Sequence, residues 1–192
     1  MSLGLRRRAL LVGSAVVLGA VGAATSVLVG STWQDEEPWP SVVLVRDPDI
    51  SLPYQVEGPR KDEGCPASTF QSPEPVAEQT VGEATVTVPL PSLDAHLLVV
   101  CMWRADEMGD TRELVRQRTG EISELMPVTE PVAVSSAFGE AVRLDTAFGR
   151  TTLLEWFTDR DGWVVSVAYL GPPPDADAVA MVEAVLTTWT WT

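Results

Sequence analysis

The stretch Thr151-Thr-Leu-Leu-Glu-Trp-Phe-Thr-Asp-Arg-Asp-Gly-Trp-Val-Val-Ser-Val-Ala-Tyr-Leu170 contains two runs of aliphatic, aromatic and β-branched residues on either side of a short acidic turn. Such runs predict strands at residues 151–158 and 163–170. The turn between them, residues 159–162, ends in Gly162, which can supply the positive φ that a tight hairpin needs. Both faces of the second strand are largely apolar, so we expect it to be a central strand of an antiparallel sheet.

Strand patterns continue on the N-terminal side of this hairpin. Residues 132–135 and 140–146 extend it to a four-strand meander, and three further strands are predicted at residues 83–88, 95–104 and 41–45. The intervening residues 46–80 carry six prolines and two glycines. Because proline cannot donate a backbone hydrogen bond, we expect neither a sustained helix nor a central strand there.

Two amphipathic helices are predicted. Asp110, followed three residues later by Glu113, forms a capping box at the start of a helix over residues 111–126. Asp175 is the expected N-cap of a C-terminal helix. The apolar face of that second helix consists of Ala178, Val182, Val185 and Trp189. The expected fold class is therefore α+β, with an antiparallel meander packed by an internal helix and a C-terminal helix.

Four segments carry a resemblance to a known family. They are residues 138–144, residues 154–163, Gly171-Pro172 and the helix after Asp175. With the order of elements, they resemble the PsbP-like α/β/α sandwich, closest to its exported actinobacterial branch of LpqN-type lipoproteins. The resemblance implies a binding or accessory role in complexes at a membrane face. It brings no catalytic motif to named positions, and the chain lacks the lipidated cysteine of that branch.

The N-terminus has the pattern of a membrane anchor. Arg6-Arg7-Arg8 precede an uncharged apolar segment from Ala9 to Val29, and about 20 such residues can cross the hydrocarbon layer of a bilayer. Positive charge stays on the cytoplasmic side. The expected layout is a cytoplasmic basic stub at 1–8, a transmembrane signal-anchor at 9–29, a linker at 30–40 and an extracytoplasmic α+β domain at 41–192. Trp33 and Trp39 suit the outer membrane interface.

A cleaved signal peptide is the alternative for the same segment. The small residues at 21–24 resemble a cleavage site, and a secreted domain would then be released. Cys65 and Cys101 are the two cysteines of the chain and both follow the apolar segment. In an oxidising compartment such a pair is expected to form a structural disulfide.

The charge of the chain excludes nucleic acid as an expected partner. There are 27 acidic and 13 basic residues, and every acidic residue lies beyond Gln34. A surface of that sign repels phosphate backbones. Arginine greatly outnumbers lysine and asparagine is absent, a composition typical of a GC-rich bacterium such as an actinobacterium.

Motifs for catalysis, cofactors or metals are not found. His96 is the single histidine, in a strand pattern where a packing role is expected, and no nucleophile elbow or phosphate loop is present. The acidic pairs at 106/107, 159/161 and 175/177 are better explained as helix entry, hairpin turn and N-cap. We therefore predict no catalytic residue, no cofactor and no metal site.

Seven tryptophans offer candidate contact residues. Trp156, Trp163 and Trp189 are expected in the core, while Trp103 and Trp191 are the candidates for an interaction surface, because aromatic residues concentrate at interface anchors. The function expected is that of a membrane-anchored, non-enzymatic interaction or accessory domain of the bacterial cell envelope, with the membrane and other envelope proteins as partners. The alternatives are a carrier of a small or lipidic envelope ligand and, third, a carbohydrate hydrolase.

Overall fold

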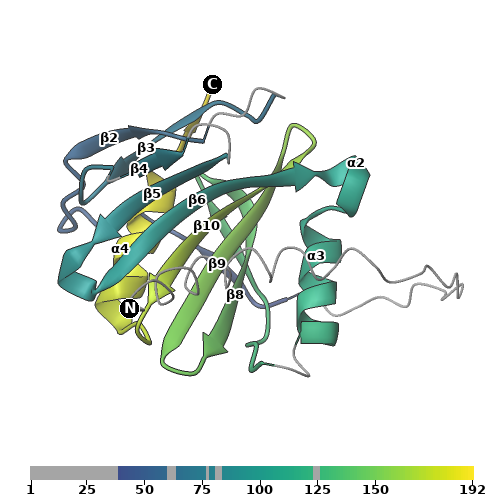
Figure 1. The fold of residues 1–192 in the computed structure, drawn as a ribbon. Helices are drawn as coiled ribbons and strands as arrows, with labels where there is room; N and C mark the ends of the chain where they lie inside the picture. The colour runs from purple at the N-terminus through teal and green to yellow at the C-terminus, as the bar shows by residue number, and fades with distance from the viewer. Residues whose placement is uncertain (1–38, 60–63, 77, 81–83, 123–125) are drawn as a thin grey trace, which may run out of the picture. The chain divides into compact units, whose positions relative to one another are not determined.

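The structure is a computed structural model that describes residues 39–59, 64–76, 78–80, 84–122 and 126–192. One large mixed sheet forms its main part (Figure 1). Its described strands are β1 (Ser41–Val43), β4 (Glu78–Thr80), β5 (Thr85–Leu90), β6 (Ala95–Arg104), β7 (Val132–Ser136), β8 (Gly139–Phe148), β9 (Thr151–Arg160) and β10 (Trp163–Gly171). They follow the order β1-β7-β8-β9-β10-β6-β5-β4, and the neighbours from β8 to β4 can be followed in Figure 1. Neighbours are antiparallel except β1 and β7, which are parallel. The fold class is α+β, as predicted.

The predicted hairpin is at the centre of this sheet. β10 lies between β9 and β6, and every residue from Trp163 to Tyr169 is buried. Asp161 and Gly162 at the turn have φ values of 51° and 79°. Two successive positive values are typical of the two-residue turn whose twist matches a right-handed strand pair. The central position and the turn are therefore confirmed.

A second, three-stranded sheet occupies much of the proline-rich stretch. It contains β2 (Tyr54–Glu57), β3 (Ser68–Ser72) and β11 (Thr190–Trp191), in the order β11-β3-β2 and all antiparallel. The sequence predicted no central strand in residues 46–80, but β3 is the middle strand of this sheet. The prolines flank β2 and β3 and do not interrupt them, so no hydrogen bond of the ladder is lost.

The described helices are α2 (Ala105–Met108), α3 (Thr111–Gln117) and α4 (Ala176–Thr187), with a 3₁₀ turn, η1, at Pro91–Leu93. Two of these helices, α3 and α4, begin at their predicted caps, whereas the short α2 was not predicted. Asp110 accepts a hydrogen bond from the Glu113 N–H, and Asp175 accepts one from the Ala178 N–H. α3 is α-helical only to Gln117 and continues as a π-helical turn, η2, over Arg118–Ile122. The sequence had predicted a continuous α-helix through residue 126.

The two longer helices cover opposite faces of the large sheet. Val182 and Val185 of α4 belong to the same buried cluster as Trp156 of β9. Leu114 of α3 belongs to a second cluster with Phe157, the next residue of β9. Since successive side chains of a strand point to opposite faces, α4 and α3 lie on the two sides of the sheet (Figure 1).

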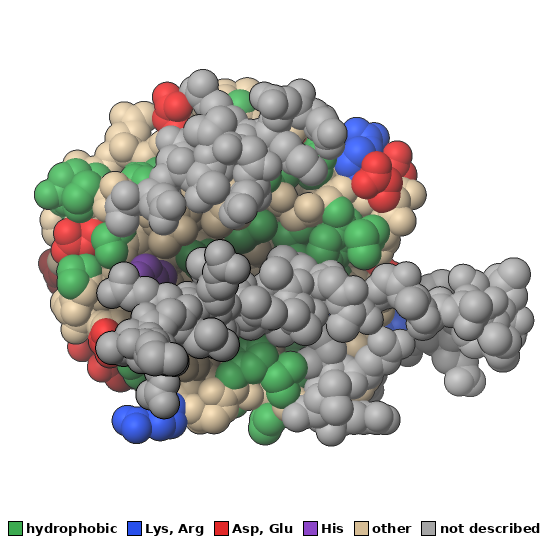
Figure 2. Space-filling view, in the orientation of Figure 1, with side chains coloured by type: hydrophobic (Ala, Val, Ile, Leu, Met, Phe, Trp, Pro, Cys, Tyr) green, Lys and Arg blue, Asp and Glu red, His purple; other side chains and the backbone are tan. Residues whose placement is uncertain are grey.

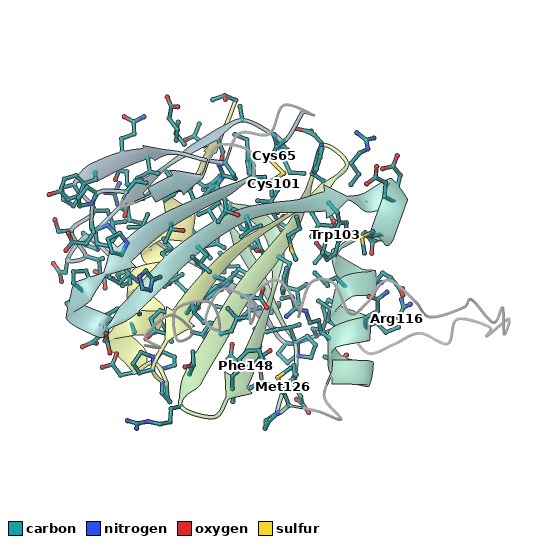
Figure 3. All side chains as sticks on the ribbon, in the orientation of Figure 1. Cys65, Cys101, Trp103, Arg116, Met126 and Phe148 are labelled. Carbon is teal, nitrogen blue, oxygen red and sulfur yellow. A yellow bond between two sulfur atoms is a disulfide. The ribbon has the colours of Figure 1, made fainter. Side chains whose placement is uncertain are left out.

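A disulfide joins Cys65, which precedes β3, to Cys101 of β6, as Figure 3 shows. It links positions 36 apart, confirms the predicted pairing and ties the proline-rich stretch to the large sheet. The apolar segment at 9–29 and Trp33 lie outside the described residues. Within the part that is described, no helix has the length and apolar character to span a membrane.

Candidate interaction surface

Trp103 and Trp191, the predicted contact residues, are both partly buried. The Trp103 indole N–H donates to the Gly109 carbonyl at 3.0 Å, and the ring packs against the cluster on the α3 side (Figure 3). The Trp191 N–H donates to the Phe138 carbonyl at 3.0 Å, on the α4 side. Their polar atoms are satisfied, and the two rings pack on opposite faces of the sheet, so they do not form one continuous patch.

The Trp191 ring belongs to an aromatic cluster that joins the two sheets. Phe70 of β3 stacks on Trp189 with ring centroids 4.7 Å apart, and Phe138 meets Trp189 edge-on at 4.8 Å. Trp191 lies 5.8 Å from Phe138. Stacked and edge-to-face pairs of this kind contribute about 0.5–1.5 kcal/mol beyond their buried area. The cluster fills the space beneath the smaller sheet, and Trp156, Trp163 and Trp189 are all buried, as predicted.

Trp39 also packs within the domain. It is partly buried against the cluster of the α3 side, and the Arg112 guanidinium lies 5.9 Å from the centre of its ring. A cation over an indole face is attracted by the ring quadrupole. The structure thus gives Trp39 a packing role at the entrance to β1, and its predicted contact with a membrane interface stays a prediction.

Exposed apolar side chains gather instead in one short segment. Among the described residues, the large apolar side chains with substantial exposure are Val42 (48%), Val43 (73%), Val45 (83%), Tyr54 (43%) and Met108 (48%). Three of these five belong to β1 and the residues just after it. Single exposed apolar residues are normal on proteins, but a contiguous group indicates a contact surface.

β1 is also an edge strand, because β7 is its one neighbour in the sheet among the described residues. Its inner side bonds to β7: the Pro40 carbonyl accepts from the Ala133 N–H, and the Leu44 N–H donates to the Ser135 carbonyl. Backbone groups of alternate residues point to opposite sides of a strand. Ser41 and Val43 therefore direct their N–H and C=O groups away from β7.

β1 has some of the usual protections of an edge strand and lacks others. Natural edges carry lysines, inward-pointing charges, bulges or prolines, or are very short. β1 is short and follows Pro40, but residues 41–45 contain no charge, and Arg46 is the first charged residue after them. We define the β1 edge as residues 41–45, and it is the best candidate contact surface among the described residues.

A buried ion pair holds η2 on the sheet. The Arg118 guanidinium donates to the Glu155 carboxylate at 2.7 Å, with the two side chains 9% and 8% exposed. The Arg118 guanidinium also lies 5.6 Å from the centre of the Phe157 ring. Burial raises the pKa of the Glu155 carboxyl above its ordinary value, and the charge of Arg118 lowers it in part. The sequence analysis did not predict this pair. The observation that could have indicated it is the charged Glu155 within the apolar run of β9.

The acidic pairs have the structural roles expected of them. Asp106 lies in the first turn of α2 and pairs with Arg104, and Asp161 forms the hairpin turn. Asp159 accepts a hydrogen bond from the Thr111 N–H, and Asp175 caps α4. The side chain of the single histidine is exposed (Figure 2). No group of three or more metal-binding side chains occurs within the described part of the chain.

A surface depression lies where the turn between β8 and β9 meets the end of β10. It is lined by Asp94, Gly149, Arg150, Thr151, Gly171, Pro172 and Pro173. Beside it, the Tyr169 hydroxyl donates to the Pro172 carbonyl at 3.0 Å, and burial raises the pKa of that hydroxyl. One acidic and one basic side chain on loop backbone do not amount to a catalytic constellation.

Comparison with known proteins gives no relative from which a role could be transferred. Neither the models of known protein families nor the curated proteins contain a match to this chain. The assignment of function therefore depends on the geometry of the β1 edge and on the physical character of the chain.

Proposed function

We propose that this protein is a membrane-anchored extracytoplasmic domain of the bacterial cell envelope that acts by binding another protein through the β1 edge. The observation that carries the proposal is the coincidence of exposed valines and outward-facing backbone groups in residues 41–45. A strand of a partner can add to such an edge, with backbone hydrogen bonds supplying affinity and side chains supplying selectivity.

The position of the β1 edge along the chain supports the proposal. The expected anchor at 9–29 and linker at 30–40 directly precede it, so the exposed edge is the part of the domain that is closest in sequence to the membrane.

The disulfide and the charge of the chain agree with an extracytoplasmic location. Structural disulfides persist in oxidising compartments and are rare in the reducing cytoplasm. The acidic surface favours solubility and disfavours nucleic acid. The interior beneath α4 is filled by buried side chains such as Trp156, Val182 and Leu186, and a binding role at the surface needs no cavity there.

The test is site-specific photo-crosslinking in intact cells. A photoreactive amino acid replaces Val43 in the β1 edge or, as the matched control, Met108 in α2, which is also apolar and exposed. Full-length protein is then purified from membranes through a tag, and its adducts and mature N-terminus are identified by mass spectrometry. Adducts from position 43 that are absent from position 108 support the proposal. No adduct at either position, or equal adducts at both, contradicts it.

A further inference from the structure

We draw no further inference here: the strongest candidate, the exposed apolar edge of β1 at residues 41–45, belongs to the surface already described, and nothing in the described part of the chain shows what covers it.

Discussion

Glu155 and Arg118 show how one buried residue pair can set the local structure around it. Glu155 shares a face of β9 with Phe157, so its carboxylate lies in the apolar layer beneath α3. The α-helix gives way to η2 at Arg118, the residue that donates to that carboxylate. π-turns of this kind are often found where a side chain has a specific task. Here η2 begins at Arg118, whose side chain pairs with Glu155 of the sheet.

The raised pKa of Glu155 predicts a particular pH dependence of stability. Because burial favours the neutral carboxyl in the folded state, the folded protein binds a proton more tightly than the unfolded chain. The stabilisation is full below the unfolded pKa and is lost as pH rises through the folded pKa. We expect the free energy of unfolding of wild type, relative to Glu155→Gln, to fall by at most about 1.4 kcal/mol per pH unit above pH 4.5.

Urea denaturation of both proteins between pH 4 and pH 8 measures this difference. Near the low end, the protonated glutamic acid and glutamine are both neutral, so the two proteins should have similar stability. If wild type instead gains stability over Glu155→Gln as pH rises, the attraction of Arg118 outweighs burial and the direction given for the pKa is wrong.

Gly171 at the end of β10 predicts a steric effect. A Cβ added there would lie 2.5 Å from the Ala95 Cβ and 2.9 Å from the Tyr169 hydroxyl oxygen. Gly171→Ala should therefore destabilise the protein by about 1–3 kcal/mol through overpacking. Gly120→Ala is the matched control, because nothing lies within 4 Å of its added Cβ. The melting temperature of Gly171→Ala should be clearly lower than that of Gly120→Ala. Equal melting temperatures would show that the backbone at the end of β10 shifts enough to accommodate the added methyl group.

Single residues were predictable where their role is local. Asp110, Asp175 and Gly162 act on backbone within a few positions, so the sequence around them was enough. The Arg118–Glu155 pair joins positions 37 apart and depends on which face of β9 meets the helix. For Trp103 and Trp191 the sequence left both a surface and a core role open, and the structure shows that each N–H donates to a carbonyl and each ring packs against a cluster.

Among the elements, strands with strong alternation were predicted well. The prediction for β6 agrees with the observed Ala95–Arg104, and β8, β9 and β10 differ by a few residues. β2 and β3 were missed because their strands are short and lie between prolines, where composition argues against strand. Their formation depends on partners distant in sequence, since β11 pairs with β3 and Phe70 packs on Trp189.

The disulfide predicts the stability of the smaller sheet. Replacing both Cys65 and Cys101 by serine removes the constraint on a loop between positions 36 apart, which costs about 3–4 kcal/mol in the chain-entropy model. Because the bond adjoins β3, amides of β2 and β3 should lose most protection in hydrogen exchange. A reductant should reproduce the effect in wild type and have none on the double variant. An unchanged urea midpoint after full reduction would contradict the prediction.

At the scale of the whole molecule, the fold class and the central meander could be predicted from the sequence. The positions of the strands outside the meander could not. β7, β8, β9 and β10 are consecutive in sequence and space. Two pairings join segments that are distant in sequence: β1 pairs with β7, and β6 pairs with β10. Local sequence patterns do not specify such pairings. The parallel placement of β1 at the edge is also what leaves its valines exposed.

The compartment of the whole chain predicts its thiol chemistry. If the segment at 9–29 exports the domain, full-length protein extracted under denaturing conditions should contain no thiol that reacts with a maleimide. A chain that begins at residue 39 and is made in a reducing cytoplasm should react at both Cys65 and Cys101. A shift in gel mobility with a polymer-linked maleimide distinguishes the two. Reactive thiols in the full-length protein would place the domain in the cytoplasm.

The smaller sheet also imposes an order on biosynthesis. β3 is made long before the residues that complete its surroundings: the Gln71 N–H donates to Thr188, 117 positions later. Until those residues have emerged, β2 and β3 form an isolated hairpin, which is marginal in water. Cys101, by contrast, follows Cys65 by only 36 positions. In an oxidising compartment this bond can therefore close before β11 is translated and hold β3 beside the large sheet.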